Sequence, residues 1–79
     1  MNKQYLTLHF PDQDTTICVA FDANLTFKEN FNLLKDICNI SINENFYVFY
    51  KNIALDKNTQ IFKFYLAQYS RLHVINGKI

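Results

Sequence analysis

The sequence TFKENFNLLKDIC, residues 26–38, predicts the one long helix of the chain and thereby decides the fold. Thr26 and Glu29 have the spacing of a capping box, in which each side chain accepts a hydrogen bond from the other residue's backbone amide. Apolar side chains then recur at helical spacing and leave a polar face for solvent. The apolar stripe consists of Phe27, Phe31, Leu34, Ile37 and Cys38, and the polar face of Lys28, Asn32, Lys35 and Asp36. Asn39 is the expected helix stop, because asparagine tolerates the left-handed conformation.

Two stretches before the helix alternate between apolar and polar residues, which is the period of half-buried strands. They cover residues 5–10 and 15–21 and are separated by Pro11-Asp12-Gln13-Asp14. Proline has no amide proton for a strand ladder, and aspartate favours local side-chain bonds, so this segment predicts a turn. We therefore expect an antiparallel hairpin. The side chains expected to face inward are those of Leu6, Leu8, Phe10, Ile17, Val19 and Phe21.

The sequence after the helix predicts further strands. Residues 46–50, FYVFY, are aromatic or β-branched throughout and form a strand by propensity, but both faces are apolar, so the buried face stays open. Residues 53–55 form a second, short segment. Residues 59–70 fit either a helical turn or a packed loop, and we interpret them as a short helical turn within an ordered connection. The last strand is expected at 72–75, with Leu72 and Val74 inward.

This order of elements predicts an α+β fold. A hairpin, one helix and further strands bury their apolar faces most economically as a β-grasp, a mixed sheet of four to five strands with one α-helix packed across one face. The first and last strands would then be central and parallel. A ferredoxin-like fold would need a second full helix, and its only candidate, 59–70, lacks a strong cap. At 79 residues the chain is expected to form a single domain, 1–79.

Several segments resemble ubiquitin across nearly the whole chain. They are 16–22, the helix that begins at Thr26, Leu66 and 70–75, where Leu72-His73-Val74-Ile75 is similar to the last strand of ubiquitin. A closer resemblance is to the YukD/EsaB-type bacterial ubiquitin-like proteins, small cytosolic accessories of type VII secretion in Gram-positive bacteria. It is carried by Asn24-Leu25-Thr26-Phe27-Lys28 and Ile40-Ser41-Ile42, and the chain departs from that family at Ala67-Gln68-Tyr69-Ser70, where an acidic, glycine-containing turn is usual. The resemblance implies a ubiquitin-like, non-conjugated accessory protein for type VII secretion or its regulation.

Charge and hydropathy argue against two classes of partner. The net charge is +1 and charged residues make up 19% of the chain. This is too little positive charge to attract nucleic acid or anionic lipid. No apolar run approaches the roughly 20 residues that span a bilayer, and the first residues lack the apolar segment of a signal peptide. We expect no nucleic-acid binding, no direct membrane insertion and a cytoplasmic location.

The sequence also lacks the usual signs of catalysis. It contains no nucleophile elbow, phosphate-binding glycine loop or paired carboxylates on a helix face. His9 and His73 are expected on the same open face, but a structural zinc site needs four ligands and only Cys18 could join them, so two solvent-facing histidines are the preferred interpretation. Cys18 and Cys38 have no metal-ligand spacing and are expected as reduced thiols. We predict no enzyme activity, no cofactor and no metal.

A sulfur carrier or protein modifier is an alternative class, since both functions occur on this fold. Both chemistries need a C-terminal diglycine that can thread an activating enzyme, whereas this sequence ends Asn76-Gly77-Lys78-Ile79. A processed tail ending at Gly77 would still lack the penultimate glycine. A small oligomerising structural module is a third class.

The outer face of the predicted sheet is therefore the candidate site. Aromatic and apolar groups that form one exposed patch mark interaction surfaces. The predicted protein-binding residues are Tyr5, His9, Tyr47, Phe49, His73 and Ile75, with Cys18 and Ala20 on the same face. The competing interpretation is that Tyr47 or Phe49 packs under the chain's own loops or in a homodimer.

Overall fold

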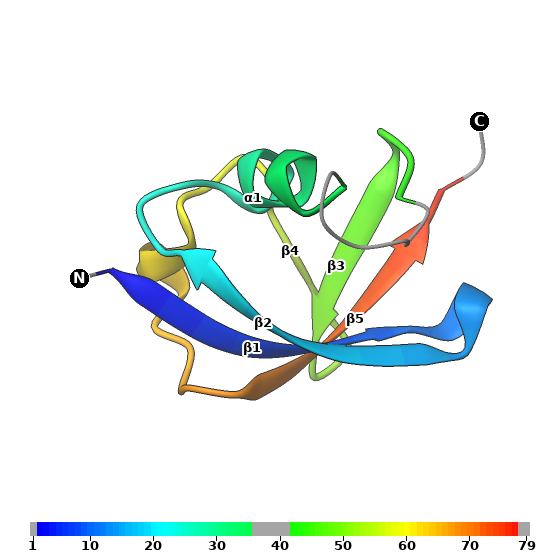
Figure 1. Cartoon of the computed structure of the whole chain (residues 1–79), viewed down its shortest axis with the longest axis horizontal. Coiled ribbons are helices and arrows are strands. Elements are labelled where there is room, and N and C mark those ends of the chain that lie inside the picture. Colours follow the sequence, from blue (N-terminus) through cyan, green and yellow to red (C-terminus); the bar gives the residue numbers. More distant parts are fainter. Residues whose placement is uncertain (1, 36–41, 78–79) are drawn as a thin grey trace.

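The computed structural model describes residues 2–35 and 42–77. Figure 1 shows a curved sheet with one helix lying across one of its faces. In chain order the elements are β1 (Lys3–Phe10), the 3-10 turn η1 (Pro11–Gln13), β2 (Thr15–Asp22), α1 (Phe27–Leu34), β3 (Phe46–Tyr50), β4 (Ile53–Leu55), the 3-10 turn η2 (Ile61–Phe64) and β5 (Ser70–Asn76). The third and fourth strands have the predicted bounds, whereas β1, β2 and β5 extend beyond theirs.

The sheet is mixed and has the strand order β2-β1-β5-β3-β4. The inner strands β1 and β5 are parallel, while β1–β2, β3–β5 and β3–β4 are antiparallel. This is the predicted β-grasp, with the first and last strands as neighbours. The connection between parallel strands is long, as it must be, and contains the helix.

The capping box predicted for α1 is confirmed. The Glu29 amide donates to Thr26 Oγ1 at 3.1 Å, and the Thr26 amide donates to Glu29 Oε1 at 3.0 Å. Within α1, the apolar stripe is buried as predicted, through Phe27, Phe31 and Leu34. The expected continuation through Ile37, Cys38 and the stop at Asn39, together with the polar residue Asp36, lies outside the described residues.

The core is centred on the ring of Phe31, which is 1% exposed. This ring meets Phe21 and Phe46 edge to face, with centroid distances of 5.4 and 4.7 Å. Edge-to-face contacts add to simple burial because the positive edge of one ring meets the negative face of another. The inward positions predicted for the first and last strands are confirmed, because Leu6, Leu8, Phe10, Leu72 and Val74 are all buried. Their burial turns the alternate residues of these strands to the opposite face.

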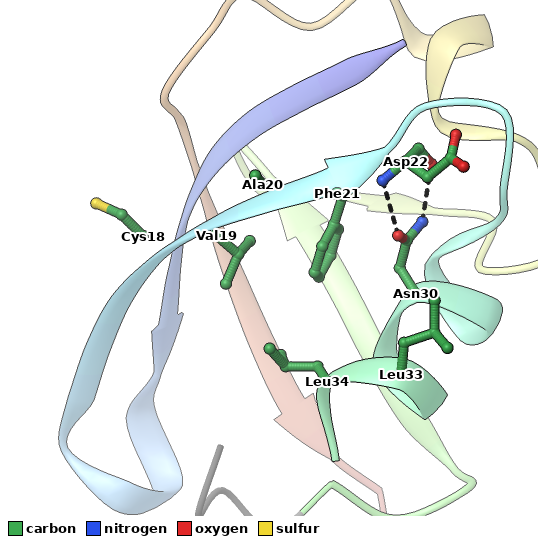
Figure 2. A pocket seen from close by; sticks show the side chains of 8 residues that line it. All are labelled: Cys18, Val19, Ala20, Phe21, Asp22, Asn30, Leu33 and Leu34. Carbon is green, nitrogen blue, oxygen red and sulfur yellow. Dashed lines mark hydrogen bonds between the residues drawn. The ribbon is translucent and has the colours of Figure 1, made fainter. Parts of the chain in front are cut away.

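Asn30, although polar, is buried on the helix face that meets the sheet, with 4% exposure. Its Oδ1 accepts from the Asp22 amide at 2.9 Å, and its Nδ2 donates to the Asp22 carbonyl at 3.0 Å and to the Thr26 carbonyl at 2.9 Å. Figure 2 shows this amide lying between α1 and the end of β2. The Asn30 side chain therefore links the helix to the edge strand β2. It pairs with the amide and the carbonyl of Asp22 as the backbone of a neighbouring antiparallel strand would.

The segment 59–70 holds one short 3-10 turn, η2, and no α-helix. The ferredoxin-like alternative is therefore excluded, since this segment was its only candidate for a second helix. Ile61 is buried, whereas Tyr65 is 91% exposed. Tyr65 has φ 53° because it ends the turn in the left-handed conformation, and this turns its side chain away from the core.

None of the helices in residues 2–35 and 42–77 has the length and apolar character needed to traverse a lipid bilayer.

Candidate functional site

The outer face of the sheet is the face opposite α1, and it is defined here by the residues that alternate with the buried ones (Figure 1). Its members are Tyr5, Thr7 and His9 on β1, Thr16, Cys18 and Ala20 on β2, Tyr47 and Phe49 on β3, and Arg71, His73 and Ile75 on β5. On β3 the inner residues Phe46 and Val48 are buried, so Tyr47 and Phe49 face outward. All the residues predicted to bind protein therefore lie on this face.

Strand register brings most of these side chains together. His9 lies beside His73 on the parallel pair β1–β5, and His73 lies beside Phe49 on the antiparallel pair β5–β3. Tyr47 is in turn the partner of Ile75. We call these five residues the outer patch. Side chains opposite one another on neighbouring strands are in contact range, so the patch is contiguous.

Three residues of the outer patch line a shallow hollow of about 310 Å³. Its lining combines Phe49, His73 and Ile75 with two residues that the sequence did not indicate, Pro11 and Asn52. Asn52 follows Lys51 in the β3–β4 turn, where φ is 67° and 49° respectively. Two consecutive left-handed residues are typical of a two-residue hairpin turn. The Lys51-Asn52 pair between two predicted strands was the sequence signal that could have placed Asn52 at the hollow.

Part of the patch is open to solvent. Tyr47 is 54% exposed, and Phe49 and Ile75 are half-buried. The loops of the described chain therefore leave Tyr47 largely uncovered. Exposed aromatic side chains are enriched at the centres of protein–protein interfaces, where they bury a large area at low entropic cost.

The two histidines touch each other, which the sequence did not predict. The Nδ1 atoms of His9 and His73 are 3.0 Å apart, and the rings meet edge to face with centroids 5.1 Å apart. One Nδ1 must donate the hydrogen bond and the other accept it, so the accepting ring carries no proton on its Nδ1. Both rings are half-buried, in contrast to the expected pair of independent, solvent-facing imidazoles.

Tyr5 stands apart from the outer patch. Its ring stacks on Tyr69, with centroids 5.5 Å apart, and its carbonyl accepts from the Tyr69 amide at 2.7 Å. Thr7 and Arg71 occupy the row between this stack and the histidines. Sequence reasoning missed Tyr69 because it precedes the last strand, and its left-handed backbone, φ 64°, turns it toward Tyr5.

A second hollow of about 410 Å³ lies between β2 and α1. Figure 2 shows Val19, Phe21 and Leu34 pointing into the space between the two elements, whereas Cys18 points away from the helix. Leu33, on the rim, is 58% exposed. This edge is separate from the outer patch.

The described part of the chain contains no group of three or more His, Cys, Asp or Glu side chains arranged to hold a metal ion. Cys18 is a free, exposed thiol near Thr7 Oγ1, at 3.8 Å, and Cys38 lies outside the described residues. Cys18 does not join the histidines as a third ligand.

Comparison with solved structures places the chain among ubiquitin-like folds. A structure from work on molecular mimicry of SUMO that promotes DNA repair has a TM-score of 0.78 and 18% identity, covering 94% of this chain and 91% of its own. The ubiquitin-like domain of an Arabidopsis thaliana protein has a TM-score of 0.75 and 20% identity, covering 100% of this chain and 82% of its own. Ubiquitin of Caldiarchaeum subterraneum has a TM-score of 0.70 and 11% identity, covering 98% and 96%. No family model and no curated protein matches the sequence.

These similarities show the fold alone: the chain has a ubiquitin-like fold. Because one fold serves many functions, function has to be argued from the surface residues.

Proposed function

We propose that this chain is a non-conjugated ubiquitin-like protein that binds another protein through the outer patch. The observation that carries the proposal is the continuous row formed by His9, His73 and Phe49, with Ile75 and Tyr47 beside it. An open hollow is lined by Phe49, His73 and Ile75 of this patch. The helix covers the opposite face of the sheet, so this face is free to receive a partner (Figure 1).

The chemistry of the patch suits a protein partner. Phe49, Ile75 and Tyr47 provide apolar and aromatic area, and the two imidazoles provide hydrogen-bonding groups beside it. Interfaces of this kind combine an apolar centre with a polar rim. Nucleic acid and lipid surfaces are not proposed as partners, because the net charge of +1 supplies little attraction for phosphate.

An accessory role in type VII secretion is the finer part of the proposal. It is supported by the sequence resemblance to YukD/EsaB-type proteins at 24–28 and 40–42, of which residues 40 and 41 lie outside the described residues. A cytoplasmic, non-enzymatic protein made of one domain would fit that role. The test is to identify the proteins recovered with the tagged chain from its own cells. Recovery of a component of a type VII secretion apparatus would support the role, and its reproducible absence would count against it.

The sharper experiment uses the partner so identified. Phe49→Asp combined with Ile75→Asp puts two charges into the centre of the patch, and we expect partner affinity to fall by about 30-fold or more, the equivalent of about 2 kcal/mol at a hot spot. Leu33→Asp is the control, because it places one such charge on an apolar, exposed residue beside the other hollow.

Circular dichroism and thermal melting would establish that all variants are folded. Since Phe49 is half-buried, Tyr47→Asp serves as a second patch variant at a more exposed position. Unchanged affinity in both patch variants, or equal loss in the Leu33 control, would show that the partner docks elsewhere.

A protein modifier or sulfur carrier is the second candidate, favoured by the similarity to an archaeal ubiquitin. Against it, the Gly77 amide donates to the Asn45 carbonyl at 2.8 Å, and the Gly77 carbonyl accepts from Asn43 Nδ2 at 3.0 Å. Gly77 is thus held against the residues that precede β3. Intact-mass spectrometry of the protein from its own cells separates the two candidates, because a thiocarboxylate or an adduct would change the mass.

A homodimer through the outer patch is a further possibility that the sequence raised. Sedimentation of the isolated chain would reveal it as a concentration-dependent increase in mass. Loss of that increase in the Tyr47→Asp variant would assign the dimer contact to the patch.

A further inference from the structure

The two histidines are held together by the strands that carry them. His9 and His73 are direct partners in the parallel pair β1–β5, at the centre of the sheet. Thr16 adjoins His9 on one side, and Phe49 adjoins His73 on the other. Neighbouring strands therefore fix both backbone positions and limit the directions in which the rings can turn. Groups placed on rigid strands are held more precisely than groups on loops.

The separation of the ring nitrogens is that of two ligands on one metal ion. The Nδ1 atoms are 3.0 Å apart. With metal–nitrogen bonds of about 2.0 to 2.1 Å, that separation corresponds to an angle of about 91° to 97° at the metal. Adjacent positions of a square-planar or octahedral ion are 90° apart, whereas a tetrahedral ion with the same bond lengths would require nitrogens about 3.3 to 3.4 Å apart.

We propose that His9 and His73 chelate one divalent transition-metal ion through their two Nδ1 atoms, with Ni²⁺ and Cu²⁺ preferred over Zn²⁺. Imidazole suits all three ions, and with water in the remaining positions Ni²⁺ is octahedral and Cu²⁺ tetragonal, both with adjacent ligands about 90° apart, while Zn²⁺ prefers a tetrahedron. This inference does not depend on the proposed partner.

Binding requires both rings to reorient, because the hydrogen bond lies along the line between the two Nδ1 atoms and the shared ion would lie about 41° to 44° off that line. In the hydrogen-bonded pair one Nδ1 carries a proton, and coordination needs both Nδ1 lone pairs, so that proton moves to the Nε2 of the same ring with no change in net charge. Each ring must also tilt so that its lone pair points to the shared ion, and the χ2 torsion of histidine is soft enough to allow this. The half-buried rings leave one side of the ion facing solvent, where water completes the coordination.

Two protein ligands set the character of the site. Since no third His, Cys, Asp or Glu of the described residues joins the pair, this is an open chelate and not a structural metal centre. Arg71 lies on the same face of β5 and is exposed, so its charge is screened by solvent. The open positions would be available to a ligand from a bound protein.

The test uses the chain without a histidine tag, titrated with Ni²⁺ alone and followed by amide NMR. Paramagnetic broadening should begin at residues around His9 and His73. His9→Gln and His73→Gln should each raise the half-saturating Ni²⁺ concentration by at least about tenfold, since even outer-shell changes cost 10- to 100-fold in metal affinity. Cys18→Ser is the matched control and should leave the titration unchanged. Zn²⁺ is diamagnetic, so its binding is followed by amide chemical-shift changes, and it should need a higher concentration than Ni²⁺.

Several results would overturn the proposal. Equal Ni²⁺ titration of the wild-type chain and either Gln variant would show that the pair is no chelate. Broadening centred on the N-terminal amine or on Cys18 would assign the binding to another group, and tighter binding of Zn²⁺ would contradict the geometry. Far-UV circular dichroism of the Gln variants establishes that they are folded, and a failed metal test would leave the partner-binding experiment unaffected.

Discussion

Replacing Asn30 should loosen the attachment of α1 to the sheet. The Asn30 amide makes hydrogen bonds to both backbone groups of Asp22 and to the Thr26 carbonyl, and it is almost completely buried. Asn30→Ala removes all of them and leaves the Asp22 amide without its partner, whereas the Asp22 carbonyl still accepts from the Leu25 amide at 3.1 Å. The Thr26 carbonyl still accepts from the Asn30 backbone amide at 3.0 Å, so its loss is partial.

The expected magnitude follows from these bonds. A neutral hydrogen bond contributes about 0.5 to 1.5 kcal/mol net, and an unsatisfied buried group costs about 1 to 3 kcal/mol, so the gross loss is about 2 to 4 kcal/mol. Alanine is the better helix former by about 0.5 kcal/mol, which offsets part of it. For a domain of this size we expect the midpoint of thermal unfolding to fall by about 10 °C or more.

The assay is urea unfolding and thermal melting of Asn30→Ala beside Asn32→Ala, its matched control on the exposed side of the same helix. Asn32→Ala should be neutral or slightly stabilising. Asn30→Asp should be at least as damaging as Asn30→Ala, because a carboxylate oxygen would replace the Nδ2 donor and face the carbonyls of Asp22 and Thr26. If Asn30→Ala loses less than about 0.5 kcal/mol, the contribution of a single hydrogen bond, the reasoning is wrong.

Two further changes test the packing. Phe31→Ala should cost about 3 to 5 kcal/mol because it leaves a cavity among Phe21, Phe27 and Phe46, and chemical denaturation should show a much larger loss than for Phe31→Leu. Gly77→Ala should cost about 1 to 3 kcal/mol by overpacking, since an added Cβ would clash with the Asn45 carbonyl oxygen and lie 2.9 Å from the Tyr47 ring. An unchanged melting temperature for Gly77→Ala would mean that this end of β5 shifts freely.

Local patterns were sufficient for most of the fold. The capping box at Thr26 and Glu29 depends on residues three positions apart, and the alternation in β1 and β2 depends on neighbouring residues. These patterns can be recognised in the sequence because the interacting residues lie in the same short segment. The same reasoning located the outer face on β1 and β5, where only one face is apolar.

Longer-range contacts were not readable in this way. Residues 46–50 are apolar on both faces, so only their packing under α1 shows that Tyr47 and Phe49 point outward. Asn30 is polar, so its sequence context predicts a solvent-facing position on the helix. It is buried because its side chain forms hydrogen bonds with the backbone of Asp22 at the end of β2. Tyr69 joins Tyr5 only because its backbone is left-handed.

The amino-acid sequence by itself determined the α+β class, the order of its elements, the inward faces of the first and last strands and the absence of a phosphate-binding charge pattern. The tertiary structure alone decided the register of β1 against β5. This register brings His9 and His73 together from opposite ends of the chain, with their Nδ1 atoms 3.0 Å apart. The physical reason is that periodicity specifies which face a side chain takes, whereas the partner across the sheet is chosen by the packing of the whole core.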